Sequence, residues 1–483
     1  MYKISKKNII AVVLLFFALN LFSQEKIKGI HELQADEMQK DLVIPVAKKQ
    51  SNVAIIPLDA NKVSSMKKVV FGFLPDWEYG RGAHNNMKYD LLTHIALFDF
   101  VLKKDGKITY PAGWPWTDVI NSAHAKGTMA IMAVTNFGIS HDELSTILNG
   151  TVEKEAFFKN IKNIITTYKL DGVNIDFEGF KTADRGDVIN SFMLDLTSYI
   201  HGQLPGKEVS FDGPAVNWSG WKFEGLVDAV DHIFIMSYDY NRNKGKYADP
   251  VAPLYRGSWS KCIDVTITSS STGYAAAVAK SPEKIILGVP YYGQKWQTVN
   301  DKLYASVVKR ISSTRYKNDF AKYNTYGRQW DTKSHTPWYK YMSNGDWYEV
   351  YSDDEGSLSE KYDYAIDKKL GGVGIWALNY DGTRDELWNL LKTKFWKDPL
   401  GIDEDYLDAV SIYPNPTTGK VSIDAEGAGK ITSVQIINTQ SQIVFSVEGN
   451  VNQIDFSNQE SGLYLVKINF EKGYSKVQKL IKK

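Results

Sequence analysis

The sequence predicts an α/β protein built on a (β/α)8 TIM barrel, because short apolar segments alternate with helix-like segments through its middle. Eight apolar segments follow one another, at residues 69–74, 94–98, 129–134, 172–177, 209–211, 232–236, 284–289 and 372–375. Most of them precede stretches with helical periodicity, among them 117–126, 155–168, 188–203 and 385–395. This alternation predicts parallel strands joined by helical crossovers, and the active site of such a barrel lies at the carboxyl ends of its strands.

The fourth apolar segment has polar residues at every second position. On a strand, Asn174, Asp176 and Glu178 would share one face, while the residues between them are apolar and would pack outward. Buried carboxylates are rare unless they are paired, and crowding tends to keep one of them protonated, as a general acid requires. The alternative, a solvated edge strand, is disfavoured because the other face is strongly apolar.

The run from Asp171 to Glu178 resembles the signature of family 18 glycoside hydrolases, the chitinase family, which reads Asp-x-x-Asp-x-Asp-x-Glu. Asn174 stands where that pattern has its second aspartate. Residues about 68–398 resemble the family, and they imply a barrel domain at 67–400. Five further segments are similar to family strands in the family's order, at residues 70–73, 93–98, 236–239, 287–293 and 371–376.

The resemblance implies which residues carry the chemistry. Family 18 enzymes use the 2-acetamido group of the substrate as the nucleophile, so one protein acid is enough. That acid would be Glu178, with Asp176 stabilising the cyclic cation and Tyr238 orienting the acetamido oxygen. The residues implied to bind substrate are Asn174, Asp239, Met236, Trp376, Tyr291 and Phe98. We expect no cofactor and no metal, because the eight histidines are scattered without a metal-spaced pair.

Residues 294–352 are too long for an ordinary βα loop and are rich in tryptophan and tyrosine. The resemblance implies a small α+β insertion between strands 7 and 8, forming one wall of a substrate groove. Packing of these aromatic side chains in a core of the insertion itself fits their pattern equally well.

The N-terminal segment predicts export. Three lysines precede the apolar run 9–21, which indicates a secretory signal at residues 1–23 with cleavage near Ser23. Residues 24–66 are polar and predict a tether, with a short helix around 31–40 and no role in the chemistry.

The net charge of +1 gives no electrostatic basis for binding nucleic acid. The single cysteine, Cys262, provides neither a disulfide framework nor a lipid attachment site near the predicted cleavage point. We expect a monomer.

Short strands separated by turns predict a C-terminal β-sandwich at residues 408–483. The segments 411–419 and 461–464 and the basic ending resemble the sorting domain of the type IX secretion system. The resemblance implies export through the inner membrane by the signal peptide and through the outer membrane by the type IX machinery, to the cell surface or the medium. An adhesive or carbohydrate-binding sandwich is disfavoured, because the strands lack an aromatic row for stacking on sugars.

These features predict a secreted hydrolase of β-1,4-linked N-acetylglucosamine polymers, chitin or chitooligosaccharides, with a retaining, substrate-assisted mechanism. Asn174 and the absence of the Ser-x-Gly-Gly motif common in chitinases keep a peptidoglycan or N-glycan endo-N-acetylglucosaminidase as an alternative. A non-catalytic chitin-binding lectin is disfavoured because Glu178 and Asp176 are both retained.

Overall fold

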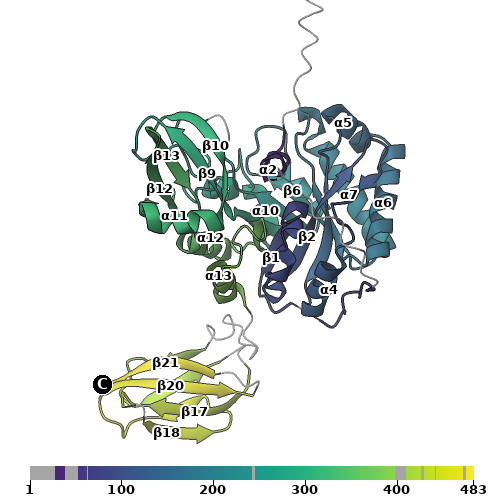
Figure 1. The fold of residues 1–483 in the computed structure, drawn as a ribbon. Helices are drawn as coiled ribbons and strands as arrows, with labels where there is room; N and C mark the ends of the chain where they lie inside the picture. The colour runs from purple at the N-terminus through teal and green to yellow at the C-terminus, as the bar shows by residue number, and fades with distance from the viewer. Residues whose placement is uncertain are drawn as a thin grey trace, which may run out of the picture. The chain divides into compact units, whose positions relative to one another are not determined.

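The computed structural model describes two compact units that divide between residues 394 and 395 (Figure 1). The described residues are 28–38, 53–62, 64–241, 245–396, 410–425, 429–440, 442–471 and 475–483. The predicted signal at 1–23 lies outside them. Within the described ranges, no helix is long and apolar enough to cross a membrane.

Eight parallel strands form a closed barrel in the first unit, which confirms the predicted fold class. The last barrel strand pairs with the first, since Val69 lies opposite Gly372 and Gly72 opposite Ile375. Closure leaves no unpaired edge, and the interior fills with side chains. The barrel strands are β1 (Val69–Pro75), β2 (His94–Leu102), β4 (Met129–Thr135), β5 (Gly172–Asp176), β6 (Glu208–Pro214), β7 (His232–Met236), β8 (Ile285–Pro290) and β14 (Gly372–Trp376), with β3 (Ile108–Thr109) pairing antiparallel to β2.

Helices between the strands cover the outside of the barrel, with α4, α6 and α7 along one flank in Figure 1. α6 buries Phe157, Ile161 and Ile165 at helical spacing, which gives it one apolar face against the barrel. The helices of this unit that follow β1 are α3 (Asp76–Gly80), α4 (Thr117–Lys126), α5 (His141–Asn149), α6 (Val152–Tyr168), α7 (Asp187–Gln203), α8 (Phe223–Ala229), α9 (Ile263–Thr268), α10 (Ala275–Lys280), α11 (Tyr316–Tyr326), α12 (Glu355–Asp367) and α13 (Glu386–Phe395).

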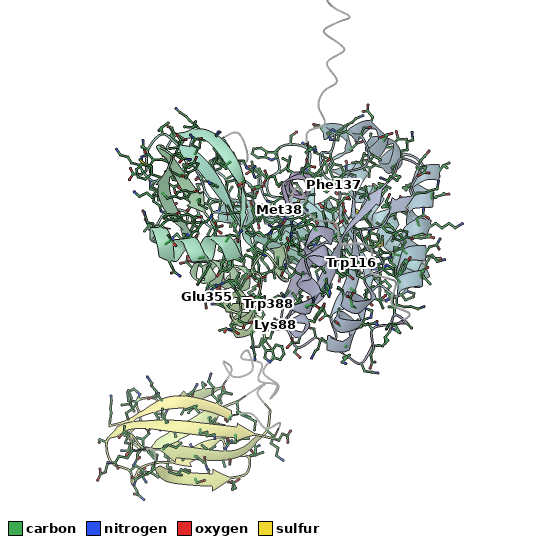
Figure 2. All side chains as sticks on the ribbon, viewed as in Figure 1. Met38, Lys88, Trp116, Phe137, Glu355 and Trp388 are labelled. Carbon is green, nitrogen blue, oxygen red and sulfur yellow. The ribbon has the colours of Figure 1, made fainter. Side chains whose placement is uncertain are left out.

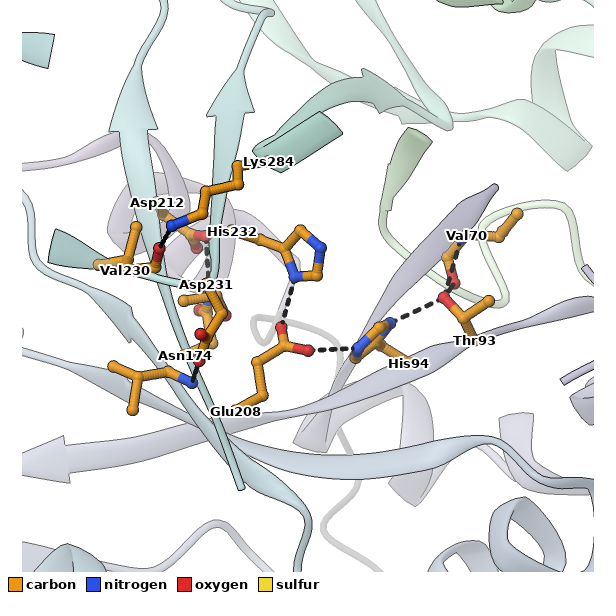
Figure 3. Close-up of polar contacts among 12 residues, drawn as sticks. Val70, Thr93, His94, Asn174, Glu208, Asp212, Val230, Asp231, His232 and Lys284 are labelled. Carbon is orange, nitrogen blue, oxygen red and sulfur yellow. Dashed lines mark hydrogen bonds and ion pairs between the residues drawn. The ribbon is translucent and has the colours of Figure 1, made fainter. Parts of the chain in front are cut away.

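A polar network closes the amino end of the barrel strands. Glu208 lies between two histidines, with Oε2 2.7 Å from His94 Nε2 and Oε1 3.0 Å from His232 Nδ1 (Figure 3). Burial alone would raise the pKa of Glu208, but the charge of His94 and the hydrogen bonds from both rings hold that pKa well below its usual range. All three residues begin their strands, at the end of the barrel that contributes to stability and not to chemistry.

The segment between β8 and β14 forms the predicted α+β insertion. A five-stranded antiparallel sheet, in the order β10-β9-β13-β12-β11, packs with α11. Several aromatic residues of this segment are buried in its own core, among them Trp296, Trp338 and Tyr339. The core interpretation is therefore correct for these three. The strands are β9 (Tyr292–Thr298), β10 (Val307–Arg315), β11 (Gln329–Asp331), β12 (Thr336–Ser343) and β13 (Asp346–Tyr351).

The second unit contains two antiparallel sheets that share one apolar core, as a β-sandwich does. Val421 and Ile454 come from the smaller sheet, and Ile436 and Val466 from the larger one. The smaller sheet holds β15 (Ser411–Tyr413), β16 (Lys420–Asp424) and β19 (Gln453–Asp455), and the larger holds β17 (Ile431–Ile437), β18 (Ile443–Glu448), β20 (Gly462–Phe470) and β21 (Ser475–Lys482).

The buried Glu349 of the insertion predicts a pH-dependent stability. Burial raises the pKa of Glu349 from 4.5 to about 8, while the Tyr351 hydroxyl donates to Oε2 at 3.0 Å. The folded state therefore holds this proton more tightly than the unfolded state, and stability falls as the pH rises from about 4.5 through 8. Glu349→Gln should leave the melting temperature nearly unchanged at pH 5 and raise it by several degrees at pH 9. The exposed Glu283→Gln is the matched control, and an equal effect at both pH values would contradict the prediction.

The separate cores predict that the second unit is dispensable for the first. Deleting residues 405–483 should leave the melting transition of the barrel and its activity unchanged, because the buried apolar clusters of the sandwich lie within that unit. Calorimetry and turnover of the purified truncated chain check this. A barrel that no longer melts cooperatively would show that the sandwich is part of the folding unit.

Candidate active site

The end of β5 brings the predicted carboxylates into the barrel. Asn174 and Asp176 have no exposed surface, and Glu178, two residues beyond the strand, is 8% exposed. Asp176 lies opposite Thr135 of β4 in the parallel register, so it stands at the carboxyl end of both strands. This is the end at which barrel enzymes carry their chemistry.

Asn136, just after β4, fixes the backbone of the predicted acid. Its Nδ2 donates to the Glu178 carbonyl and its Oδ1 accepts the Glu178 N–H, both at 2.9 Å. A side-chain amide that uses both its donor and its acceptor on one residue leaves that residue little freedom. Asn136 therefore holds the main chain from which the Glu178 side chain extends.

A third carboxylate, Asp212 of β6, lies beside this group. Asn174 Nδ2 donates to Asp212 Oδ1 at 2.8 Å and to Ser210 Oγ at 3.2 Å. Burial raises the pKa of both Asp176 and Asp212 well above the usual range, and the negative charge of Asp176 raises that of Asp212 further. Neighbouring buried carboxyls with raised pKa values in a barrel mouth are typical of a catalytic site.

His31 of α2 (Ile30–Met38) fills the space between these groups and is completely buried. Its Nδ1 lies 2.7 Å from Asp176 Oδ2, its Nε2 lies 2.7 Å from the Tyr238 hydroxyl, and its backbone N–H donates to Glu178 Oε1 at 2.9 Å. The imidazole stacks on the Trp376 indole with a centroid separation of 3.5 Å and an interplanar angle of 13°. One ring thus contacts Asp176, Tyr238 and Trp376, and the adjoining backbone contacts Glu178.

Of the other predicted site residues, Phe98 borders this space, with its ring centroid 5.8 Å from that of His31. Phe98 meets Trp376 edge to face at 4.9 Å, and Met236 is the buried last residue of β7. Asp239 has left-handed backbone conformation, and its negative charge acts on Arg310 of β10.

The Tyr291 side chain packs in a different direction. Its hydroxyl lies 3.1 Å from that of Tyr362 on α12, and the next residue, Tyr292, is the one whose ring approaches Tyr238, at 6.0 Å. The structure therefore does not place Tyr291 with the predicted site group, and its role as a substrate contact stays a prediction.

The interpretation of residues 24–66 as a tether is wrong for residues 28–38, which contact the predicted site residues. A short helix was expected there, and α2 forms, but it lies in the site. Sequence reasoning also missed Asn136 and Asp212. Asp212 directly follows a predicted strand and Asn136 follows one after a single residue, and a polar residue at the end of a barrel strand was the signal that could have identified them.

Among the residues that the structure describes, two groups of side chains have the donor types and proximity of metal ligands. They are His94, Glu208 and His232 at one end of the barrel, and His31, Asp176 and Asp212 at the other. Within each group the ligand atoms lie within 4.8 Å of one another. The hydrogen bonds described above already engage atoms of both groups, so we assign these residues to hydrogen bonding and derive no step through a metal.

The chain is similar in sequence to proteins that are named as glycan-cleaving enzymes. The human di-N-acetylchitobiase is 26% identical over 271 residues, which cover 48% of this chain and 66% of that protein. A putative sporulation-specific glycosylase of Bacillus subtilis is 27% identical over 294 residues, covering 59% and 65%. This chain therefore spans just under two thirds of the length of both relatives.

Solved structures share the barrel fold. The Bacillus cereus spore cortex-lytic enzyme superposes with a TM-score of 0.55 at 21% identity, covering 67% of this chain and 73% of that one. A chitinase from Cycas revoluta superposes with a TM-score of 0.59 at 18% identity, covering 68% and 99%.

Family models match both units. The secretion system C-terminal sorting domain matches residues 411–483, which indicates export to the cell surface or the medium by type IX secretion. The model of glycosyl hydrolases family 18 matches residues 69–381, which include every barrel strand and the residues around Asp176 and Glu178. The chain belongs to glycosyl hydrolases family 18.

Proposed function

We propose that the protein hydrolyses β-1,4-linked N-acetylglucosamine glycans by a retaining, substrate-assisted mechanism. The observation that carries the proposal is the set of groups that surround the His31 imidazole in the barrel mouth. Asp176 offers an acceptor at one edge, Tyr238 offers a hydroxyl donor at another, and Trp376 forms the floor. An acetamido group has the matching N–H donor and carbonyl acceptor, and a sugar ring stacks on an indole face.

The residues support each step of such a reaction. Glu178 donates its proton to the glycosidic oxygen as the bond to the anomeric carbon breaks, and the acetamido oxygen forms the new bond to that carbon. Asp176 accepts a hydrogen bond from the acetamido N–H and stabilises the positive charge of the cyclic intermediate. Glu178, now a carboxylate, then takes a proton from the water that opens this ring, so the β configuration returns.

The names of the relatives support a glycan that contains N-acetylglucosamine, and they leave two substrate classes. Chitobiases and chitinases fit chitooligosaccharides, whereas the spore cortex-lytic enzyme and the cortical fragment-lytic enzyme of Bacillus anthracis, 25% identical over 315 residues, fit peptidoglycan. We favour chitin or chitooligosaccharides, with peptidoglycan and N-glycans as the alternatives that product analysis separates. A lectin is disfavoured because Asp176 and Glu178 both occupy the barrel mouth.

Substitution of the general acid tests the proposal. Glu178→Gln keeps the size and the hydrogen-bonding oxygen but removes the transferable proton, so turnover should fall by about 10²-fold or more while oligosaccharide binding is retained. The assay follows products from chitin oligomers, peptidoglycan and a high-mannose glycoprotein, with the full chain and with a chain that starts at residue 53. Glu155→Gln, on the exposed face of α6, is the control. A Glu178→Gln protein that retains more than about a tenth of the rate would refute the assignment.

Restoring the family's aspartate tests the carboxylate group. Asn174→Asp replaces the amide that donates to Asp212 by a second carboxylate at the same place, and two carboxylates at about 2.8 Å share a proton. The pH–rate profile should change shape on its acidic limb. Because the shared proton is held more tightly in the folded state, stability should fall more steeply from pH 5 to pH 8 than in the wild type.

The exchanged pair Asn174→Asp with Asp212→Asn is the matched control. It restores one amide and one carboxylate at this contact, so the wild-type profile and pH stability should return. A pH profile for Asn174→Asp identical to that of the wild type would contradict the coupling of residue 174 to Asp212.

A further inference from the structure

We infer that α2 is an autoinhibitory segment of this protein. Residues 28–38 occupy the position at which the sugar would bind, and a glycan enters only when they leave. The identity of the displaced sugar rests on the proposed function, whereas the blocked site rests on the contacts of the segment alone.

His31 reproduces the interactions expected of the substrate. A neutral imidazole that donates from Nδ1 to Asp176 and accepts the Tyr238 hydroxyl proton at Nε2 uses the same two partners as an acetamido group. Its ring covers Trp376 at 3.5 Å, the separation of direct stacking. Because the imidazole lies on the indole and Trp376 itself has no exposed surface, a sugar cannot stack on Trp376 while His31 is present.

The backbone before His31 covers the predicted acid. A Cβ on Gly29 would collide with Glu178 Oε2, so the main chain at Gly29 runs directly over this carboxyl group. The His31 N–H, in the first turn of α2, donates to the other carboxyl oxygen, where the positive end of the helix dipole favours a negative charge. A leaving glycosidic oxygen would need this position, and only a residue without a side chain fits at 29.

The opposite end of α2 is attached to the insertion. Glu37 forms an ion pair with Arg310 of β10 and accepts the Ser313 N–H at 3.1 Å, and Gln34 donates to Ser313 Oγ at 3.1 Å. Burial alone would raise the pKa of Glu37, but the hydrogen bonds from Arg310 lower it, so the pair is charged at neutral pH.

A further contact joins α2 to the barrel side. Arg81, which follows α3, donates to the carbonyl of Met38 at 2.9 Å. Figure 1 shows α2 in purple between β10 and the barrel strands, and Figure 2 marks Met38 in the same region. The helix therefore contacts both the insertion and the barrel, the two elements that border the site.

Because α2 belongs to the same chain as the barrel, it competes with a free glycan as an intramolecular ligand. An internal ligand of this kind can reach an effective concentration of about the mM range. A free glycan competes poorly at lower concentration. Cleavage of the chain within residues 39–52 turns the segment into a dissociable peptide and opens the site.

Variants of α2 test the inference in the full chain. His31→Ala removes the ring, and Gly29→Val forces a side chain against Glu178, so both should raise kcat/KM on chitooligosaccharides by at least about tenfold, equivalent to about 1.4 kcal/mol. Asp36→Asn, on the exposed side of the same helix, is the control and should not change it. A synthetic peptide of residues 28–38 should inhibit the chain that starts at residue 53, and the peptide with His31→Ala should not.

Two results separate this inference from the proposed function. If the α2 variants are no faster than the wild type although Glu178→Gln abolishes turnover, α2 is part of the working enzyme and the inference is wrong. If no variant binds or hydrolyses an N-acetylglucosamine oligomer, the proposed function fails. Amide hydrogen exchange at residues 28–38 then tests whether α2 blocks the site. Slow exchange at residues 28–38 that becomes fast in Gly29→Val supports it, and fast exchange in the wild type overturns it.

Discussion

The burial of Asp176 is the constraint on which the site depends. A carboxylate without exposed surface is costly unless it is protonated or has a polar partner, and removing its partner leaves an uncompensated group. In this chain His31 supplies that partner, as Asn174 does for Asp212. Any molecule that replaces His31 must bring a hydrogen-bonding group to Asp176, as the N–H of an acetamido group would.

The two ends of the barrel both contain buried carboxyl groups, but the pKa values of these groups shift in opposite directions. At the amino end, Glu208 has two histidine partners and its pKa is lowered, so its charge is permanent and stabilising. At the carboxyl end, Asp176 and Asp212 lie close together and their pKa values are raised. Buried carboxyls with raised pKa values at the carboxyl end of a barrel are typical of an active site, whereas a carboxylate held in its charged form between two histidines is typical of a structural contact.

Local pattern was enough to predict the barrel and the sandwich, and the family resemblance implied the insertion. The alternation of residues around Asp176 and Glu178 has strand periodicity, so the sequence predicts their common face. The partners of these residues depend on tertiary contacts. His31 lies 145 positions from Asp176 in a polar segment, and Asn136 reaches Glu178 from a neighbouring strand. One residue of register decides that Tyr292, and not Tyr291, approaches Tyr238. Periodicity says which face a residue shares but not which distant segment covers that face.

An inhibitory α2 must stay bound while a substrate competes for the position of His31, and contacts at both of its ends make this possible. A nine-residue helix has little stability of its own in water, so its order depends on the contacts that it makes. His31 lies in the first turn of α2, and its contacts fix that end of the helix. The ion pair of Glu37 with Arg310 and the bond from Arg81 to Met38 order the remaining turns, and they lie outside the sugar position. A glycan that displaces His31 must therefore also break the Glu37 and Met38 contacts, which it cannot replace. Cutting the chain lowers the effective concentration of α2 at the site and so weakens all of its contacts together.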